Sequence, residues 1–392
     1  MARVLLGWEL GANTGHIVTL RSLASALLAN GHEVALALQR IDAAGPDPDP
    51  RIRLWQAPLW PSLLAGRSLP SATSPVSMGD ILGRLGLAQQ GTLSSLIAGW
   101  DAIFSAENPH LVIGDFAPAL MTAAAGRIPS AHIGNGFCLP PPRAPRFSPL
   151  GEGPPAFAED DLLDTADAEL ALSGRPPLRS LPALFDAGHL FVLSLDVLDP
   201  YRAARDQAGF APDIRGPVAV GHGAGGNELF VYCTPATALQ PGFLDGLGKC
   251  GLPVRLHMAE QPVPLIAQIR ARGFSFEAHP LPFTRIAART RLVLSHGGSG
   301  FVSTALLSGL PQIVIDHDLE KRATGLAVEA LGVGRRMALA GLDGAALAAL
   351  IRDVAGDGAL AARCLSLLPE LRQQAQRAAL PALVALADAQ GR

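Results

Sequence analysis

The sequence is short of charge. Asp, Glu, Lys and Arg together make up only 17% of the 392 residues, and the formal net charge at pH 7 is -3. The 31 Lys and Arg residues are scattered and form no basic stripe. Because a protein that follows a phosphate backbone needs clustered cations, we do not expect a nucleic-acid partner.

Cysteine is scarce as well. The chain has four, Cys138, Cys233, Cys250 and Cys364, with no CxxC pair and no short Cys/His cluster of the kind that binds zinc. They predict reduced, mostly buried thiols and a cytoplasmic location. The run Asp316-His317-Asp318 brings no further ligand with it and is interpreted as a loop after a strand, so no metal site is predicted.

Long hydrophobic runs are missing too. No stretch approaches the roughly 18 uncharged apolar residues of a membrane-spanning helix. The apolar run Val4-Leu5-Leu6 is too short for a signal peptide, and Glu9 follows it. We therefore expect a chain without a transmembrane segment, with peripheral membrane contact left open.

Apolar residues, in contrast, are plentiful. They make up 49% of the chain, enough for two cores, and the length fits two domains. The first half predicts a βαβ unit: a buried strand over 4–8, a Gly-rich turn over 11–15, an amphipathic helix over 17–28 and a strand over 34–38. Such units build parallel sheets with right-handed crossovers.

A second α/β segment begins near residue 228. In the first half, a later strand over Leu111 to Gly114 ends at Asp115. Both halves are predicted to be Rossmann-like. The composition of Gly216-Pro217 and of 221–226 is typical of a hinge, so we expect domains over 1–215 and 216–392, the second ending in helices from Leu342 onward. Strands of the second domain are expected at 229–233, 254–256, 292–295 and 312–315.

Two segments predict surface loops. Residues 45–80 are rich in Pro, Ser and Gly, and residues 139–155 (LPPPRAPRFSPLGEGPP) are rich in Pro. Loops at the strand ends of α/β folds tend to carry binding function. Aromatic residues that could line an acceptor pocket, although core packing is the default reading for each, are Trp8, Trp55, Trp60, Phe137 and Phe147.

The clearest chemical signal is the run from Ser295 to Gly300 (SHGGSG), between a predicted strand and a predicted helix. Glycines let a backbone approach a phosphate closely, and the first turn of a helix presents unpaired N–H groups with about half a positive charge. Ser299 and His296 add donors. The pattern predicts an anion site, although a plain βα turn would have the same composition.

With its surroundings, this run resembles the GT-B glycosyltransferases that use nucleotide sugars, in particular the UDP-glucuronosyl/glucosyltransferase-like and macrolide glycosyltransferase-like family. The turn is followed by Gly309-Leu310-Pro311-Gln312 and by Leu331-Gly332-Val333-Gly334, as in that family. Near the N-terminus, Gly15-His16 and Gly31-His32-Glu33-Val34 match as well, and Gly216-Pro217 matches the family's GP pair. The resemblance covers residues 3 to 340 and is thin in the acceptor loops.

The resemblance implies a GT-B fold, two facing Rossmann-like domains with an interdomain cleft, the first binding an acceptor and the second a nucleotide-sugar donor. It implies that His16 is the catalytic base and that Asp115 orients it. A histidine can take a proton from a hydroxyl near neutral pH, and a carboxylate can fix its tautomer. The implied reaction is a single displacement that inverts the sugar. It needs no metal, because helix dipole and backbone N–H groups stabilise the departing diphosphate.

The donor site is implied to use His296 and the turn Gly297, Gly298, Ser299 and Gly300, with further contacts from Thr234, Phe283, Thr304 and Glu320. This chain departs from the family at three places. The family's ribose-binding Glu is Thr304, the Thr after HGGxG is Phe301, and the DQ pair falls on Glu320-Lys321. Phe283 takes the place of a family Gln and could stack on a base. The donor is expected to be a UDP- or dTDP-sugar used as co-substrate, with no cofactor, and its sugar stays open.

The sequence therefore predicts an inverting, metal-independent glycosyltransferase that moves a sugar to a hydroxyl of a small hydrophobic or glycolipid acceptor. Two alternatives stay open: a catalytically silent GT-B protein that binds sugar or a partner, and a nucleotide-sugar epimerase of the same fold. A nicotinamide dehydrogenase is disfavoured, since no GxGxxG with an acidic residue about 20 positions on follows the first strand. The acceptor and the oligomeric state are not encoded in any motif.

Overall fold

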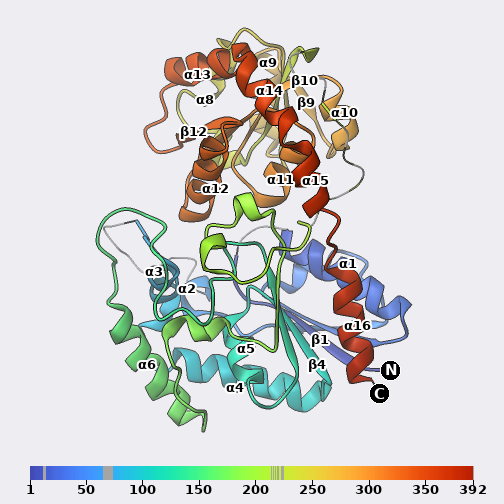
Figure 1. The fold of residues 1–392 in the computed structure, drawn as a ribbon, viewed down its shortest axis with the longest axis vertical. Coiled ribbons are helices and arrows are strands. Elements are labelled where there is room, and N and C mark those ends of the chain that lie inside the picture. Colours follow the sequence, from blue (N-terminus) through green and yellow to red (C-terminus); the bar gives the residue numbers. More distant parts are fainter. Residues whose placement is uncertain are drawn as a thin grey trace. The chain divides into compact units, whose positions relative to one another are not determined.

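The computed structural model describes residues 1–11, 15–64, 74–212, 214, 216, 218, 220–221 and 225–391 (Figure 1). The chain divides into two compact units. Unit 1 comprises Met1–Leu193, Tyr201–Phe210 and Ala378–Arg392, and unit 2 comprises Ser194–Pro200 and Ala211–Arg377. Among the described residues, no helix is both long and apolar enough to cross a membrane.

Unit 1 is built on a parallel six-stranded sheet in the order β3-β2-β1-β4-β5-β6. The inner strands are continuous apolar runs, because helices cover both faces of a parallel sheet. The strands are β1 (Arg3–Trp8), β2 (Glu33–Leu38), β3 (Ile52–Gln56), β4 (Leu111–Asp115), β5 (Ser130–Gly134) and β6 (His189–Val192). This order is that of a Rossmann fold.

Helices and short turns connect these strands. α1 buries Ile17, Leu20, Leu23, Ala24 and Leu27 against the sheet. The elements are α1 (Gly15–Ala29), η1 (Ile41–Ala44), α2 (Pro61–Leu64), α3 (Met78–Leu82), η2 (Gly83–Leu87), α4 (Thr92–Glu107), α5 (Pro118–Ala124), α6 (Glu159–Leu172), η3 (Leu181–Phe185), η5 (Arg202–Ala204) and α16 (Leu380–Gln390).

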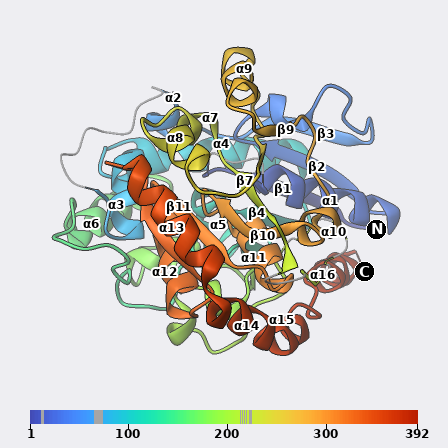
Figure 2. The ribbon, with the colours of Figure 1, turned by 90° about the horizontal axis from the view of Figure 1, so that it is seen from above.

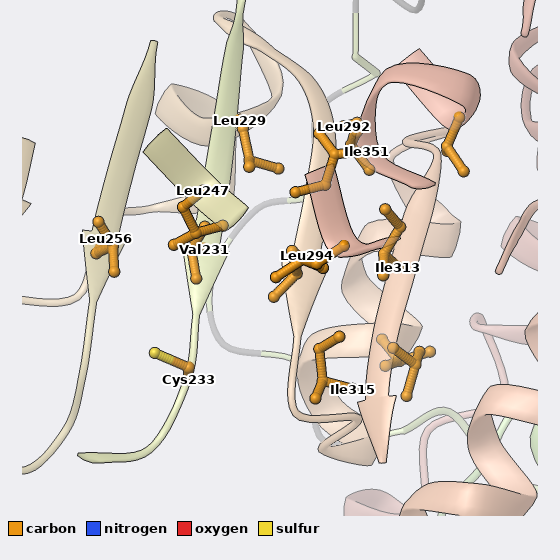
Figure 3. Packing of buried hydrophobic residues seen from close by; sticks show 14 of the residues in the cluster. Leu229, Val231, Cys233, Leu247, Leu256, Leu292, Leu294, Ile313, Ile315 and Ile351 are labelled. Carbon is orange, nitrogen blue, oxygen red and sulfur yellow. The ribbon is translucent and has the colours of Figure 1, made fainter. Parts of the chain in front are cut away.

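Unit 2 repeats the architecture with a parallel sheet in the order β12-β11-β10-β7-β8-β9. Side chains from four neighbouring strands meet Leu247 of α8 and Ile351 of α13 in one apolar core (Figure 3). The strands are β7 (Glu228–Tyr232), β8 (Val254–His257), β9 (Ser275–Glu277), β10 (Thr290–Ser295), β11 (Gln312–Asp316) and β12 (Gly334–Ala338).

The helices of unit 2 cover this sheet. α13 packs against α8 and contacts β10, β11 and β12. Figure 2 shows it lying across β11. The elements are η4 (Asp196–Leu198), α7 (Pro235–Ala238), α8 (Phe243–Gly248), α9 (Val263–Ala271), α10 (Phe283–Ala287), α11 (Ser299–Leu307), α12 (Leu319–Ala330), α13 (Gly344–Gly356), α14 (Gly358–Ser366) and α15 (Leu368–Gln374).

The structure confirms the two α/β halves and the strands predicted in each of them. The segment 139–155 contains no regular element, as predicted. Reading residues 45–80 as loop was wrong in part, because they contain β3, which pairs in parallel with β2 at the edge of the sheet, as well as α2 and the start of α3. Residues 65–73 of this segment lie outside the described residues. The short edge strands β6, β9 and β12 were not predicted, because short partly exposed strands have no long apolar run. Of the predicted turns, residues 12–14, Pro217 and 222–224 lie outside the described residues.

The last helix crosses the predicted domain boundary. The sequence places everything after residue 216 in the second domain, whereas α16 packs with α1 in unit 1, as Figure 1 shows. Leu383 and Ala387 of α16 lie in the core of unit 1. The difference arises because the apolar stripe of a helix does not reveal which sheet it covers.

The packing of α16 gives a testable prediction. Leu383 is 3% exposed and Leu380 of the same helix is 38% exposed. Leu383→Ala should therefore lower the free energy of unfolding of unit 1 by about 2–5 kcal/mol, because it leaves a cavity. Leu380→Ala is the matched control and should have little effect.

Denaturant unfolding followed by tryptophan fluorescence measures this difference, since all four tryptophans, Trp8, Trp55, Trp60 and Trp100, lie in unit 1. Equal midpoints for the two variants would contradict the assignment of α16 to the core of unit 1.

Candidate functional site

The first candidate site lies at the carboxyl edge of the sheet of unit 1. β1 and β4 are parallel neighbours in which Trp8 is paired with Asp115. α1 begins at Gly15 and carries His16 in its first turn. Nδ1 of His16 lies 2.8 Å from Oδ1 of Asp115, and the carboxylate is buried. The structure thus brings together the two residues predicted as the catalytic pair, 99 positions apart in the chain.

The imidazole of His16 is held by rings as well. Trp8 stacks on it at a centroid distance of 5.6 Å, and Phe116 lies at 6.2 Å. A Cβ at Gly11, where φ is +91°, would come within 2.3 Å of Nε2. Glycine at position 11 therefore satisfies the backbone conformation and the close approach of the ring together.

The residue after Trp8 is a buried carboxylate that the sequence did not single out. Glu9 follows β1, is inaccessible to solvent, and accepts hydrogen bonds from the indoles of Trp60 (3.2 Å) and Trp100 (2.7 Å). It also accepts from the backbone N–H groups of Ala119 (3.0 Å) and Leu120 at the start of α5. Burial raises the pKa of Glu9 to about 7, and these hydrogen bonds offset part of the rise. The signal that could have revealed this residue was a charged side chain directly after an apolar strand.

The second candidate site is the glycine turn of unit 2. β10 ends at Ser295, and α11 begins at Ser299. Gly297 has φ +81°, and a Cβ there would lie 2.8 Å from Val314, so the turn requires glycine. Gly298 is the N-cap of α11 and makes no side-chain capping bond. The first N–H groups of a helix without such a cap form an anion-binding arrangement.

His296 lies in this turn. It is buried, its backbone N–H donates to the carbonyl of Tyr232 (3.2 Å), and its Nδ1 has no hydrogen-bond partner among the described residues. Burial lowers the pKa of His296 to about 4, and Lys321 and His317 add to the effect. The ring is therefore neutral near pH 7. A buried ring nitrogen without a partner is costly unless a ligand supplies one.

The predicted nucleotide residues lie around the turn. The hydroxyl of Thr304 donates to the carbonyl of Gly300 at 2.6 Å, inside α11. Phe283 packs its ring on Phe301 at 5.1 Å, and Phe301 is also 5.1 Å from Tyr232. The departure at position 301 therefore belongs to an aromatic cluster with Phe283 and Tyr232, which the sequence analysis did not anticipate.

Thr234 and Glu320 lie on two other elements of unit 2. Thr234 is the N-cap of α7, and its hydroxyl accepts from the N–H of Thr237 at 3.2 Å. Glu320 in α12 is paired with Lys321, whose side chain is 2% exposed. Cα and Cβ of Lys321 lie beside Gly297, and the charge of this buried side chain contributes to the lowered pKa of His296.

The predicted loop Asp316-His317-Asp318 is occupied by structural contacts. Asp316 binds the guanidinium of Arg336 at 2.7 Å, and Asp318 caps α12 by accepting from Lys321 N–H at 2.8 Å. No group of three or more His, Cys, Asp or Glu side chains that could hold a metal occurs in the described part of the chain.

Four of the five aromatic residues considered for an acceptor pocket are buried, in line with the default reading of core packing. Trp8, Trp60, Phe137 and Phe147 are each less than 9% exposed. Trp55 lies on the edge strand β3, where its indole donates to Glu107 at 2.6 Å.

Comparison with known proteins finds a family model that matches the C-terminal part of the chain. Residues 245–385 match the model of the family described as "Erythromycin biosynthesis protein CIII-like, C-terminal domain". No curated protein sequence matches the chain.

Solved structures match over nearly its whole length. The calicheamicin glycosyltransferase CalG4 is 17% identical, with a TM-score of 0.69 over 100% of this chain and 98% of its own. The glycosyltransferase VinC in complex with dTDP is 18% identical, with a TM-score of 0.61 over 98% and 99%. The spinosyn rhamnosyltransferase SpnG complexed with spinosyn aglycone is 17% identical, with a TM-score of 0.62 over 99% and 100%.

Fold and family match together define the class of protein, the GT-B glycosyltransferases. The chain has the fold of these enzymes, and residues 245–385 match the EryCIII-like C-terminal family model. The resemblance and the fold class predicted from the sequence are both confirmed.

The burial of Glu9 predicts a pH dependence of stability. The pKa of Glu9 is about 7 in the folded chain and 4.5 as the reference value. Between these pH values the folded chain holds a proton that the unfolded chain has released, so this group's contribution to stability falls as the pH rises. Glu9→Gln does not titrate. Its stability relative to the wild type should therefore rise by on the order of 3 kcal/mol from pH 4.5 to 8.

Glu169→Gln is the matched control, because Glu169 is also buried and accepts the N–H groups of Gly91 and Ser94 near the start of α4. Burial alone would raise the pKa of Glu169, but bonds from Ser94 and Gly91 outweigh it and lower the pKa. The pH dependence of stability that Glu169 causes therefore lies below pH 4.5. Unfolding of both variants followed by tryptophan fluorescence tests the prediction, and a flat pH profile for Glu9→Gln would refute it.

Proposed function

We propose that the chain is an inverting, metal-independent glycosyltransferase that moves a sugar from a nucleotide-sugar donor to a hydroxyl of a small-molecule or lipid acceptor. The observation that carries the proposal is the 2.8 Å contact between Nδ1 of His16 and the buried Asp115 carboxylate. Because the carboxylate accepts a hydrogen bond from Nδ1–H, the neutral ring carries its lone pair on Nε2, which suits a general base.

The proposed reaction is one displacement. Nε2 of His16 takes the proton of the acceptor hydroxyl as its oxygen attacks the anomeric carbon of the donor. The bond from that carbon to the diphosphate oxygen breaks, and the electron pair leaves with the diphosphate. Asp115 stabilises the imidazolium that forms. Attack opposite the leaving group inverts the anomeric configuration.

The leaving diphosphate is proposed to bind at the glycine turn of unit 2. Gly297 and Gly298 let it approach the backbone, and the N-terminus of α11 presents N–H groups to it. Nδ1 of His296, buried and without a partner among the described residues, is proposed to bind one phosphate oxygen. These groups and the buried cation of Lys321 would supply the charge compensation that a metal gives other enzymes.

The same comparison supports a proposal for the classes of donor and acceptor. VinC was solved with dTDP, and SpnG with spinosyn aglycone. We propose a dTDP- or UDP-sugar for unit 2, with Thr234, Phe283, Thr304 and Glu320 near the nucleoside and sugar, and a hydrophobic natural-product acceptor for unit 1. The four cysteines are free thiols, which favours a reducing compartment and therefore the cytoplasm.

The role of His16 is tested by substitution. His16→Ala should lower kcat by roughly a hundred- to ten-thousandfold, the range for loss of a general base, with little change in donor binding. Steady-state transfer from a dTDP-sugar to a panel of hydrophobic alcohols and phenols measures this, and NMR of the product gives its anomeric configuration.

The solvent-exposed His189 of the same unit supplies a control, since His189→Ala should remain fully active. Retention of activity in His16→Ala would refute the base, a retained anomeric configuration would refute the single displacement, and loss of activity on adding a chelator would refute metal independence.

Donor binding gives a separate prediction. A nucleoside diphosphate at a hundred times its dissociation constant should stabilise unit 2 by about 2.7 kcal/mol. His296→Ala should reduce this gain, whereas the exposed His279→Ala should not. A thermal-shift panel of UDP, dTDP and their sugars measures both, and no shift with any of them would contradict the proposed donor site.

A further inference from the structure

The turn that follows β4 has an unusual backbone. Phe116 comes directly after Asp115 and has φ +45°, one of two non-glycine residues with positive φ among the described residues. A bulky residue in this conformation costs about 1–3 kcal/mol, and such strain persists only where the surroundings hold it. The strained residue adjoins the carboxylate that binds His16.

Successive backbone groups of the turn form hydrogen bonds with the surrounding structure. The N–H of Phe116 donates to Ile133 (3.3 Å), and its carbonyl accepts from Leu10 (3.1 Å). The next N–H, that of Ala117, donates to Nε2 of His132 at 3.0 Å. Of these partners, His132 alone is a side chain, and it lies on β5 with no solvent exposure.

The tautomer of His132 is set by its other nitrogen. Nδ1 donates to the carbonyl of Phe185 at 3.1 Å, and the ring stacks on Phe185 at 5.8 Å. Nε2 therefore carries the lone pair that accepts from Ala117. Burial lowers the pKa of His132 to about 4 against the opposing effect of the Phe185 carbonyl, which keeps the acceptor available near neutral pH.

The same turn also places a ring on the proposed base. Phe116 lies 6.2 Å from His16 and 6.4 Å from Phe185. Phe185 thus contacts both Phe116 and His132. The three rings form one packed group that joins the turn to His132, which accepts the N–H of Ala117. Beyond the turn, Glu9 accepts the N–H groups of Ala119 and Leu120, which fixes the start of α5.

We propose that His132 is a positioning residue, which holds the turn after β4 and through it the Asp115 carboxylate and the Phe116 ring against His16. It touches neither His16 nor substrate and acts through the N–H of Ala117. The catalytic consequence rests on the proposed function of His16, while the structural part, the geometry of the His16–Asp115 contact, does not.

The test replaces His132 by residues that either keep or remove a hydrogen-bond acceptor for the N–H of Ala117. His132→Phe keeps a flat ring against Phe185 and removes the acceptor, which leaves the buried N–H of Ala117 unpaired. Displacement of Asp115 should lower kcat about a hundredfold, because misplacement by about 1 Å costs that much, while KM for the donor is unchanged. His132→Gln, whose amide oxygen reaches the position of Nε2, should restore most of kcat.

The matched control is His32→Phe. His32 is also buried in unit 1, and its Nδ1 accepts the N–H of Ala2 at 3.2 Å, before the first strand. The substitution likewise leaves a backbone N–H unpaired, here at the amino end of the sheet, and it also removes the contact of His32 Nε2 with Asp388 (3.1 Å). It should cost comparable stability and leave kcat unchanged. Equal kcat values for the two variants, each corrected for folded fraction, would overturn the proposal.

A second readout does not need activity. The proton between Nδ1 of His16 and Asp115 should give a downfield NMR resonance, assigned by its loss in Asp115→Asn. It should be lost or shift upfield in His132→Phe and persist in His132→Gln and His32→Phe. If it persists in His132→Phe, the proposal is wrong. If the wild type transfers no sugar but the resonance behaves as expected, His132 still positions the pair and the proposed function fails.

If His132→Phe does not fold, His132→Asn replaces it. Its short amide can still donate to Phe185 but does not reach Ala117, so it should show the same loss of kcat and of the resonance. Wild-type values for His132→Asn would overturn the proposal.

Discussion

The register of the parallel strands is the constraint on which both candidate sites depend. In unit 1, pairing of β1 with β4 sets Trp8 beside Asp115, and in unit 2, pairing of β7 with β10 sets Tyr232 beside Ser295. The chain leaves every parallel strand at the same edge, so residues distant in sequence meet there. A slip of one residue would turn Asp115 to the other face of the sheet and separate it from His16.

Two buried polar side chains of unit 1, Glu9 and His132, have hydrogen-bond partners around that edge. Glu9 receives two indoles and two backbone N–H groups, and His132 bridges Ala117 to Phe185. Such groups stabilise only when satisfied, and when satisfied they hold a single arrangement. This explains how a short apolar turn can hold Phe116 in a left-handed backbone conformation next to the carboxylate of Asp115.

The groups at the glycine turn of unit 2 differ from the buried carboxylates of unit 1. The turn offers backbone N–H groups and a neutral His296, beside a buried Lys321 that is paired with Glu320. Phe301, a departure from the family pattern, joins Phe283 and Tyr232 in an aromatic cluster beside that turn. The departure is therefore accommodated by packing, and it leaves the glycine turn itself intact.

The sequence by itself determined the two α/β halves, most of their strands, the glycine turn at 296–300 and the pairing of His16 with Asp115, because apolar runs, glycines and the family resemblance are all local signals. Only the tertiary structure decided the placement of α16 on unit 1, the edge strand β3, and the contacts of Glu9 and His132. These depend on which surfaces meet after the sheet has formed, and a buried polar side chain shows its role only through partners far away in the chain.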